Sequence, residues 1–131
     1  MDSVVHFEMP YDDRERIARF YQAVFGWQTQ MLGPEMGNYV LATTADTDVK
    51  PDARRGAING GFFARSPDMP GQHPSVVIAV RDIAASSRKV GEAGGKVLGT
   101  PMEIPGVGLY VAFHDTEGNR LSMLQPVLAG A

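Results

Sequence analysis

The chain repeats one layout twice, and this duplication limits the folds open to it more than any other feature. The layout is strand, acidic residue, helix, glycine and strand, present in HFEMPYDDRERIARFYQAVFGWQTQ and again in SVVIAVRDIAASSRKVGEAGGKVLG. Superposing the two segments aligns Asp13 with Asp82, Arg19 with Arg88 and Gly26 with Gly95. A sequence built from two copies of one unit is expected to fold as two similar modules.

The first copy carries the clearer helix signal. Asp12 is expected to cap the helix, with Glu15 three residues later in an aspartate version of the capping box. One apolar stripe follows at helical spacing, formed by Ile17, Phe20, Tyr21 and Val24. Gly26 suits the left-handed residue that ends such a helix. The second helix is expected to start near Asp82 and to stop at Gly94–Gly95.

Three short runs typical of strands follow each helix. They are WQTQML, NYVLAT and GGFFAR in the first half, and KVLGTP, GLYVAFH and RLSMLQP in the second half. Each half therefore reads β-α-β-β-β, an α+β unit whose sheet has a helix on one face. The sequence predicts a single domain over residues 1–131. Its modules are residues 1–66 and 74–127, joined by the Pro/Gly-rich SPDMPGQHP.

Composition narrows the classes of function. The 131 residues are 44% hydrophobic, which favours one packed domain, and the formal net charge is −3 with scattered Lys and Arg, so no nucleic-acid surface is expected. No apolar run approaches the length of about 18 residues that a membrane helix needs, and no signal peptide is recognised. We expect a cytoplasmic protein without membrane contact. Because the chain has no cysteine, any metal would need His, Asp or Glu ligands.

The order of three segments resembles a known family. They are HFEMPYDDRERIARFYQAVFGW, then NGG followed by FFAR, and finally FHDTEGNRLSMLQP. Together they resemble the vicinal oxygen chelate (VOC) superfamily, which includes glyoxalase I, bleomycin-resistance proteins and extradiol dioxygenases; only residues 44–57 fall outside the likeness. The resemblance implies two modules forming a curved, mostly antiparallel eight-stranded sheet around a small-molecule cup, with helices on the outer face. It also implies a symmetric homodimer.

Only part of the metal site that the resemblance implies is present in this sequence. Founding members hold a divalent metal with a His from the first strand of each module and a Glu from the last. His6 matches the first His, whereas Val76, Ser122 and Gly60–Gly61 stand at the other three positions. Catalytic zinc normally takes three protein ligands plus water. We therefore expect no cofactor, and a divalent metal is a possible but disfavoured alternative.

The opening strand supplies the candidate catalytic pair. Alternation in a strand sends Val5, Phe7 and Met9 towards the helix and sends His6 and Glu8 into the cup. His6 would act as a general base there, with Glu8 orienting it and raising its pKa above the ordinary value. Two other interpretations stay open, namely a relic of an ancestral metal site and a polar pair bonded into the interface between the modules.

Three residues are candidates for ligand binding. Phe62 and Phe63 face opposite ways in a strand, so one enters the core and Phe63 is assigned to the cup, where it offers an aromatic wall. Tyr110, which shares a face with His114, would cap or stack on a ligand. Ser122 occupies the position of the last family Glu. Core packing alone also explains Phe62 and Phe63, and solvation beside a turn explains His114.

Two functions remain open. The first is a metal-dependent, glyoxalase-like lyase or isomerase acting on a small carbonyl or conjugated substrate. The second is a metal-free binding protein of bleomycin-resistance type that holds an aromatic or cationic compound, and the missing metal ligands favour it. The polar stretch from Thr44 to Ala57 is expected either to close over the ligand with Arg54 or Arg55, or to be a solvated loop.

Overall fold

A computed structural model describes residues 1–45, 56–68 and 72–127 of the chain. The chain divides into two compact units, His6–Pro74 (the N-terminal unit) and Met1–Val5 with Ser75–Ala131 (the C-terminal unit). The elements in chain order are β1 (Val4–Tyr11), α1 (Arg14–Phe25), β2 (Gln28–Met31), the 3-10 helix η1 (Pro34–Met36), β3 (Val40–Thr43), β4 (Asn59–Ala64), β5 (Ser75–Ala79), α2 (Ile83–Glu92), β6 (Lys96–Ile104), β7 (Gly108–His114) and β8 (Arg120–Pro126). The predicted β-α-β-β-β order is confirmed in both halves.

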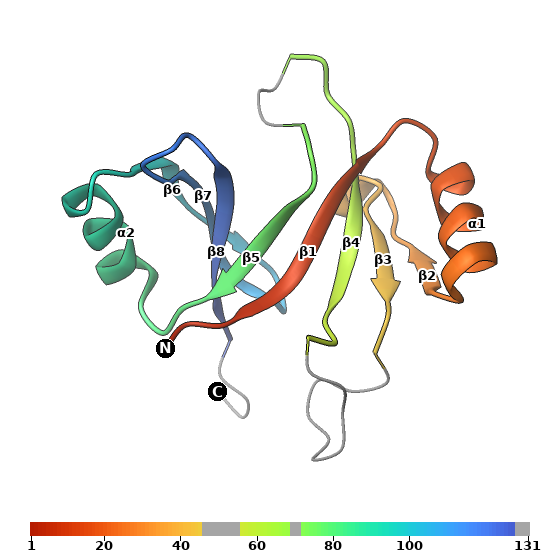
Figure 1. Ribbon diagram of the computed structural model, residues 1–131, viewed down its shortest axis with the longest axis horizontal. Coiled ribbons are helices and arrows are strands. Elements are labelled where there is room, and N and C mark those ends of the chain that lie inside the picture. The colour runs from red at the N-terminus through yellow and green to blue at the C-terminus, as the bar shows by residue number, and fades with distance from the viewer. Residues whose placement is uncertain (46–55, 69–71, 128–131) are drawn as a thin grey trace. The chain divides into compact units, whose positions relative to one another are not determined.

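In the N-terminal unit the strands follow the order β2-β3-β4-β1, and α1 lies beside them (Figure 1). The β1–β4 pair is parallel, whereas β3 pairs with β4 and with β2 in antiparallel fashion. The core of this unit is built on three buried residues, Val40, Ala42 and Phe62, against which Phe7, Met9, Tyr11, Ile17, Tyr21 and Trp27 pack. The helix therefore covers one face of the four strands, as the sequence predicts.

The register of β1 on β4 fixes which side chains share a face. Met9 pairs with Phe62 and packs with it under α1, while Glu8 pairs with Gly61 on the opposite face. Because side chains alternate along a strand, His6 shares the face of Glu8. The predicted assignment of alternate β1 side chains to opposite faces of the sheet is confirmed for His6, Glu8 and Met9. It is wrong for Val5, which is 39% exposed and belongs to the C-terminal unit.

Helix α1 begins one residue later than the capping box predicts. The Oδ1 atom of Asp13, not of Asp12, accepts a hydrogen bond from the backbone N–H of Arg16 at 3.0 Å. Asp13 has the extended backbone of an N-cap residue, with φ −135° and ψ 109°. Gly26 ends the helix in the left-handed conformation at φ 72°, as predicted.

The predicted apolar stripe of α1 is half wrong. Ile17 and Tyr21 pack on the core, but Phe20 is 54% exposed and Val24 is 57% exposed. Ala18, which the stripe omits, is the buried residue of the helix. The inward face of the helix therefore runs through Ile17, Ala18 and Tyr21, and Phe20 and Val24 lie beside it.

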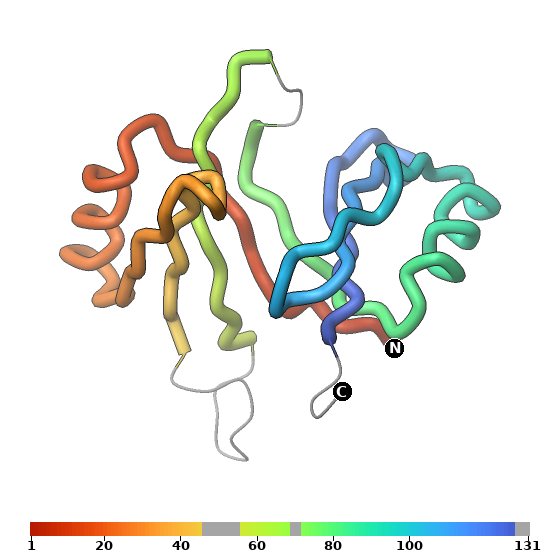
Figure 2. The backbone as a smooth tube through the Cα atoms, turned by 180° about the vertical axis from the view of Figure 1, so that it is seen from behind, coloured from red at the N-terminus to blue at the C-terminus, as the bar shows by residue number. Residues whose placement is uncertain are grey.

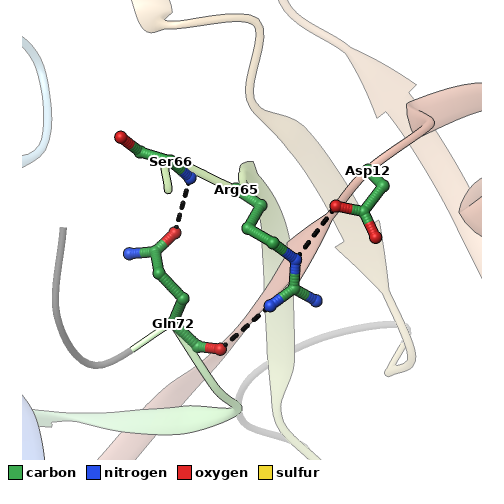
Figure 3. Close-up of polar contacts among 4 residues, drawn as sticks. All are labelled: Asp12, Arg65, Ser66 and Gln72. Atoms are coloured by element: carbon green, nitrogen blue, oxygen red, sulfur yellow. Dashed lines mark hydrogen bonds and ion pairs between the residues drawn. The ribbon is translucent and has the colours of Figure 1, made fainter. Parts of the chain in front are cut away.

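Asp12 instead forms part of a polar cluster at the end of β4 (Figure 3). Its Oδ1 accepts from Arg65 Nε at 3.0 Å, and Arg65 Nη1 donates to the Gln72 carbonyl at 3.1 Å. The Gln72 side chain in turn accepts from the backbone N–H of Ser66 at 2.8 Å. These contacts fasten both described ends of the predicted linker, whose residues 69–71 lie outside the described part.

Residue Asn59 fastens the described ends of the long polar stretch. Its Oδ1 accepts from the backbone N–H groups of Thr44 and Ala45 at 2.9 and 3.0 Å. The Thr44 hydroxyl also donates to the carbonyl of Ile58. Residues 46–55, including both arginines assigned to ligand closure, lie outside the described residues, so that expectation stays a prediction.

The C-terminal unit has the strand order β5-β8-β7-β6, with α2 beside β6–β8 (Figure 2, seen from behind). The β5–β8 pair is parallel, and the other two pairs are antiparallel. Its core is Val80, Ile83, Val111, Phe113 and Met123. The predicted start of the second helix near Asp82 is confirmed, because Asp82 is its N-cap and the Asp82 Oδ1 accepts from the Ala85 backbone N–H at 3.1 Å.

The residues before β1 also belong to this unit, and the Ser3 carbonyl accepts a hydrogen bond from the Ala79 backbone N–H at 3.0 Å. In hydrogen-bonding order the eight strands run β2-β3-β4-β1-β5-β8-β7-β6. The predicted α+β class, an eight-stranded and mostly antiparallel sheet with two helices, is confirmed. Within the described residues, no helix is both long enough and apolar enough to cross a membrane.

Candidate functional site

The sheet face of the N-terminal unit that lies opposite α1 carries the predicted catalytic side chains of this unit. We call it the His6 face and define it by six residues, of which the strand registers place five on one side and hydrogen bonds to His6 and Glu8 place Tyr39: His6, Glu8, Tyr39, Asn59, Gly61 and Phe63. The sequence builds this face by alternation, because Phe7 and Met9 of β1 and Phe62 of β4 pack on the other side, in the core with α1. Polar groups are thereby gathered on the other side.

Tyr39 joins the two predicted catalytic residues. Its hydroxyl donates to Glu8 Oε2 at 3.1 Å and lies 2.8 Å from His6 Nε2. Tyr39 directly precedes β3, where its carbonyl accepts from the Leu32 backbone N–H at 2.8 Å and closes the hairpin from β2. The structure therefore brings His6 and Glu8 together through a third side chain.

Glycine at position 61 makes room for the Tyr39 ring. A Cβ atom added at Gly61 would overlap the Tyr39 hydroxyl oxygen and the neighbouring ring carbons. Gly60 does the same on the helix side, where a Cβ would lie 2.5 Å from the Phe7 ring. The Gly-Gly pair of β4 thus accepts one aromatic ring on each face of the sheet.

The electrostatics of His6 differ from the expectation. Burial lowers the pKa of His6 below its ordinary value, and this outweighs the Glu8 carboxylate, which raises it. The prediction of a raised pKa is wrong because the imidazole is more desolvated than a wet cup allows. A His6 ring with a lowered pKa is neutral at neutral pH, and it can then accept a hydrogen bond or a proton.

The two phenylalanines of β4 divide as expected. Phe62 is fully buried in the core beneath α1. Phe63 is half-buried and pairs with Pro10, two residues beyond the Glu8–Gly61 pair on the His6 face. Its place is compatible with the predicted aromatic wall, and its role towards a ligand stays a prediction.

The other two predicted ligand residues meet in the C-terminal unit. The hydroxyl groups of Tyr110 on β7 and Ser122 on β8 lie 2.6 Å apart. Ser122 is only 4% exposed, so its hydroxyl is a buried polar group satisfied by Tyr110. The five predicted site residues thus fall into two sets in two units, and their roles stay predictions.

Strand registers show that Gly61 and Ser122 are equivalent positions. Each has one parallel and one antiparallel partner: Glu8 and Leu41 for Gly61, Val77 and Ala112 for Ser122. The sequence repeat independently places Glu8 on Val77. Of the two glycines considered for the first-half family Glu, Gly61 is therefore the counterpart of Ser122.

A tyrosine occupies the neighbourhood of each equivalent position. Tyr39 and Tyr110 both stand two residues before the antiparallel partner of that position. The Tyr110 hydroxyl reaches Ser122, and the Tyr39 hydroxyl lies where a side chain at Gly61 would begin. Each unit thus places a phenol at the position where the resemblance implies a metal-binding carboxylate.

The residues present do not fit the divalent metal of the founding enzymes. Gly61 and Val76 offer no ligand atom, and the neutral Ser122 hydroxyl is bonded to Tyr110. Across residues 1–45, 56–68 and 72–127, no three His, Asp or Glu side chains are grouped so that they could hold a metal ion. Among the four family positions only His6 keeps a metal-binding side chain.

Sequence reasoning missed Tyr39 and Asn59. Tyr39 lies at the edge of a predicted strand, where alternation alone does not show that its hydroxyl reaches β1. The available signal is Gly60-Gly61 in the facing strand, because a glycine pair in a strand marks close approach by another group. The place of Asn59 opposite His6 depends on the parallel register, which the sequence does not specify.

Comparison with known proteins agrees with this architecture. Residues 3–123 match the family described as the Glyoxalase/Bleomycin resistance protein/Dioxygenase superfamily. The chain therefore belongs to this family, as the resemblance of its segments indicates.

Relatives and solved structures give further detail. A glyoxylase-like domain-containing protein of Didymella fabae is 33% identical over 115 residues, covering 86% of this chain and 84% of that protein. The anthracycline biosynthesis protein DauV of Streptomyces sp. (strain C5) is 33% identical over 120 residues, 86% of this chain and 42% of DauV. The methylmalonyl-CoA epimerase of Mycobacterium tuberculosis has the same fold, with a TM-score of 0.68 at 14% identity, over 96% of this chain and 89% of the epimerase.

Proposed function

We propose that this domain binds a small organic molecule on the His6 face without a catalytic metal. The observation that supports this most strongly is the Tyr39 hydroxyl, which links His6 to Glu8 and fills the space above Gly61. A half-buried imidazole, a phenol and a carboxylate on one face offer convergent polar groups, which is what a binding site for a small molecule needs.

The character of the face favours an aromatic ligand. Phe63 and the Tyr39 ring supply flat apolar surface, and His6 supplies a heteroaromatic edge. DauV, which shares 33% identity with this chain, is named for anthracycline biosynthesis, and this is consistent with an aromatic ligand. The chain spans less than half of DauV, so the activity of that whole protein is not carried over.

A second candidate is a glyoxalase-like lyase or isomerase. The relative from Didymella fabae favours it, because that protein is named glyoxylase-like and the chain covers most of its length. In this role His6 would accept a proton from the substrate. Turnover of a small carbonyl compound by the purified protein, abolished by His6→Gln, would separate the enzyme from the binding protein.

The proposed function is tested by a ligand-observed NMR screen of aromatic fragments on chelator-treated protein. We expect hits whose binding is weakened by Tyr39→Phe and by His6→Gln. The matched control is Tyr11→Phe, since the Tyr11 hydroxyl lies in the same unit and donates a hydrogen bond to the Asn38 carbonyl at 2.8 Å. Hits that respond equally to all three substitutions, or to none, would refute binding on the His6 face.

A further inference from the structure

The hydrogen bonds of Tyr39 have a direction. A phenol carries one proton, and the Tyr39 hydroxyl donates it to Glu8 Oε2, because an ionised carboxylate can only accept. The contact at 2.8 Å between Tyr39 and His6 Nε2 must then use a hydrogen from the imidazole. Nε2 of His6 therefore donates to the Tyr39 oxygen.

This direction determines which ring nitrogen of His6 is available. A neutral imidazole has one N–H, so a proton on Nε2 leaves the lone pair on Nδ1. In the described part of the chain, the His6 ring makes one hydrogen bond, through Nε2. Nδ1 is thus the acceptor atom that the His6 face can offer to a ligand.

Tyr39 is held well enough to impose this arrangement. Its carbonyl accepts from the Leu32 N–H at 2.8 Å and its own N–H donates to the Met36 carbonyl at 3.3 Å, so both ends of its peptide unit are tied into the hairpin. Its ring lies nearly parallel to that of His6, with an interplanar angle of 18°, and rests over Gly61.

We propose that Tyr39 is a positioning residue that fixes His6 in the Nε2–H tautomer, so that Nδ1 accepts a hydrogen bond from a hydroxyl group of the ligand. This inference rests on the proposed function and specifies its ligand class. Combined with the aromatic surface of Phe63 and Tyr39, an acceptor at Nδ1 selects hydroxylated aromatic compounds.

The tautomer is measured directly, without ligand. Long-range ¹H–¹⁵N correlation spectra near pH ~8 distinguish a proton on Nε2 from a proton on Nδ1 in a neutral imidazole. His6→Gln identifies the His6 signals among the three histidines. We expect the Nε2–H pattern in the native protein, a mixture of tautomers in Tyr39→Phe, and no change in Tyr11→Phe.

The acceptor role is tested with two probes of similar shape, 2-naphthol and 2-methoxynaphthalene, of which only the first has a proton to donate. We expect the native protein to bind 2-naphthol about tenfold more tightly, the value of one hydrogen bond of about 1.4 kcal/mol. Tyr39→Phe should reduce this preference, because a second tautomer places a hydrogen on Nδ1.

The outcomes separate the two proposals. An Nδ1–H pattern in the native protein, or a spectrum unaffected by Tyr39→Phe, overturns the positioning role whatever binds. Equal affinity for both probes overturns the acceptor role and leaves aromatic binding on the His6 face intact. If neither probe binds, both the acceptor role and the aromatic ligand of the proposed function are refuted, while the spectrum decides the role of Tyr39.

Discussion

The hydroxyl oxygen of Tyr39 connects the two predicted catalytic residues of the N-terminal unit. Tyr39 takes the place that a side chain at Gly61 would fill and contacts both His6 and Glu8. The Glu8 carboxylate raises the pKa of His6, but the desolvation of the imidazole outweighs this and lowers it. The neutral state of His6 follows from burial rather than from its acidic neighbour.

The lowered pKa of His6 predicts how stability changes with pH. Because the folded pKa lies below the unfolded value of 6.5, the unfolded chain binds the proton more readily, and stability is lost as pH falls from the unfolded pKa through the folded one. Glutamine does not titrate. The stability of the native protein relative to His6→Gln should therefore be higher near pH ~8 than near pH ~5 in urea denaturation. A larger advantage at the acidic pH would show that Glu8 dominates.

Gly61→Ala should displace Tyr39. The added Cβ would overlap the Tyr39 ring, so we expect a loss of about 1–3 kcal/mol in the free energy of unfolding, together with loss of the His6–Tyr39 hydrogen bond. Gly91→Ala in α2 is the matched control. A Cβ there meets nothing within 4 Å, and the change should be neutral or stabilise by about 0.5–1 kcal/mol.

The double variant Gly61→Ala with Tyr39→Ala sharpens this prediction. If the clash causes the loss, the glycine substitution should cost much less once the ring is gone, and the two changes should be non-additive in urea denaturation. Additive costs would show that Gly61 is needed for another reason.

At the scale of elements, the sequence repeat predicted the N-cap residues of the two helices better than the capping-box motif did. The alignment of Asp13 with Asp82 matches two N-caps in the structure, whereas the capping-box spacing selected Asp12. Local spacing cannot choose between adjacent aspartates, because either can bond a backbone N–H nearby. Asp12 is drawn instead to Arg65, a partner distant in the sequence.

Substitution separates the roles of these two aspartates. Asp13→Ala removes the acceptor for the Arg16 N–H and should lower the melting temperature by a few degrees. Asp12→Ala breaks only an exposed ion pair and should change the melting temperature much less. Thermal denaturation followed by circular dichroism measures both, and a larger loss with Asp12→Ala would contradict the assignment of the cap.

The sequence predicted the strands and their faces because alternation is a local property of the chain. It could not predict Tyr39 as a site residue, since that role depends on the register of β3 on β4 and on the absence of a side chain at Gly61. It also overestimated the stripe of α1, because Phe20 and Val24 satisfy helical periodicity but are exposed, whereas the small residue Ala18 is buried.

At the scale of the whole molecule, the two halves keep one plan and differ in chemistry. Gly61 and Ser122 hold the same place in their units, and each lies beside a tyrosine. The first half adds His6 and Glu8 to this tyrosine, whereas the second half buries Ser122 against Tyr110. Within this family, the chain keeps the fold while the positions of three of the four family ligands carry no metal-binding side chain.

The central claim, that the His6 face works without a metal, is tested most directly by titrating Zn²⁺, Ni²⁺ and Mn²⁺ into chelator-treated protein by isothermal titration calorimetry. A single remaining ligand cannot replace the three that a catalytic zinc normally takes. The account predicts no tight binding at one ion per chain for any of the three metals, and no difference between the native protein and His6→Gln. One tightly bound ion per chain, lost in His6→Gln, would contradict it.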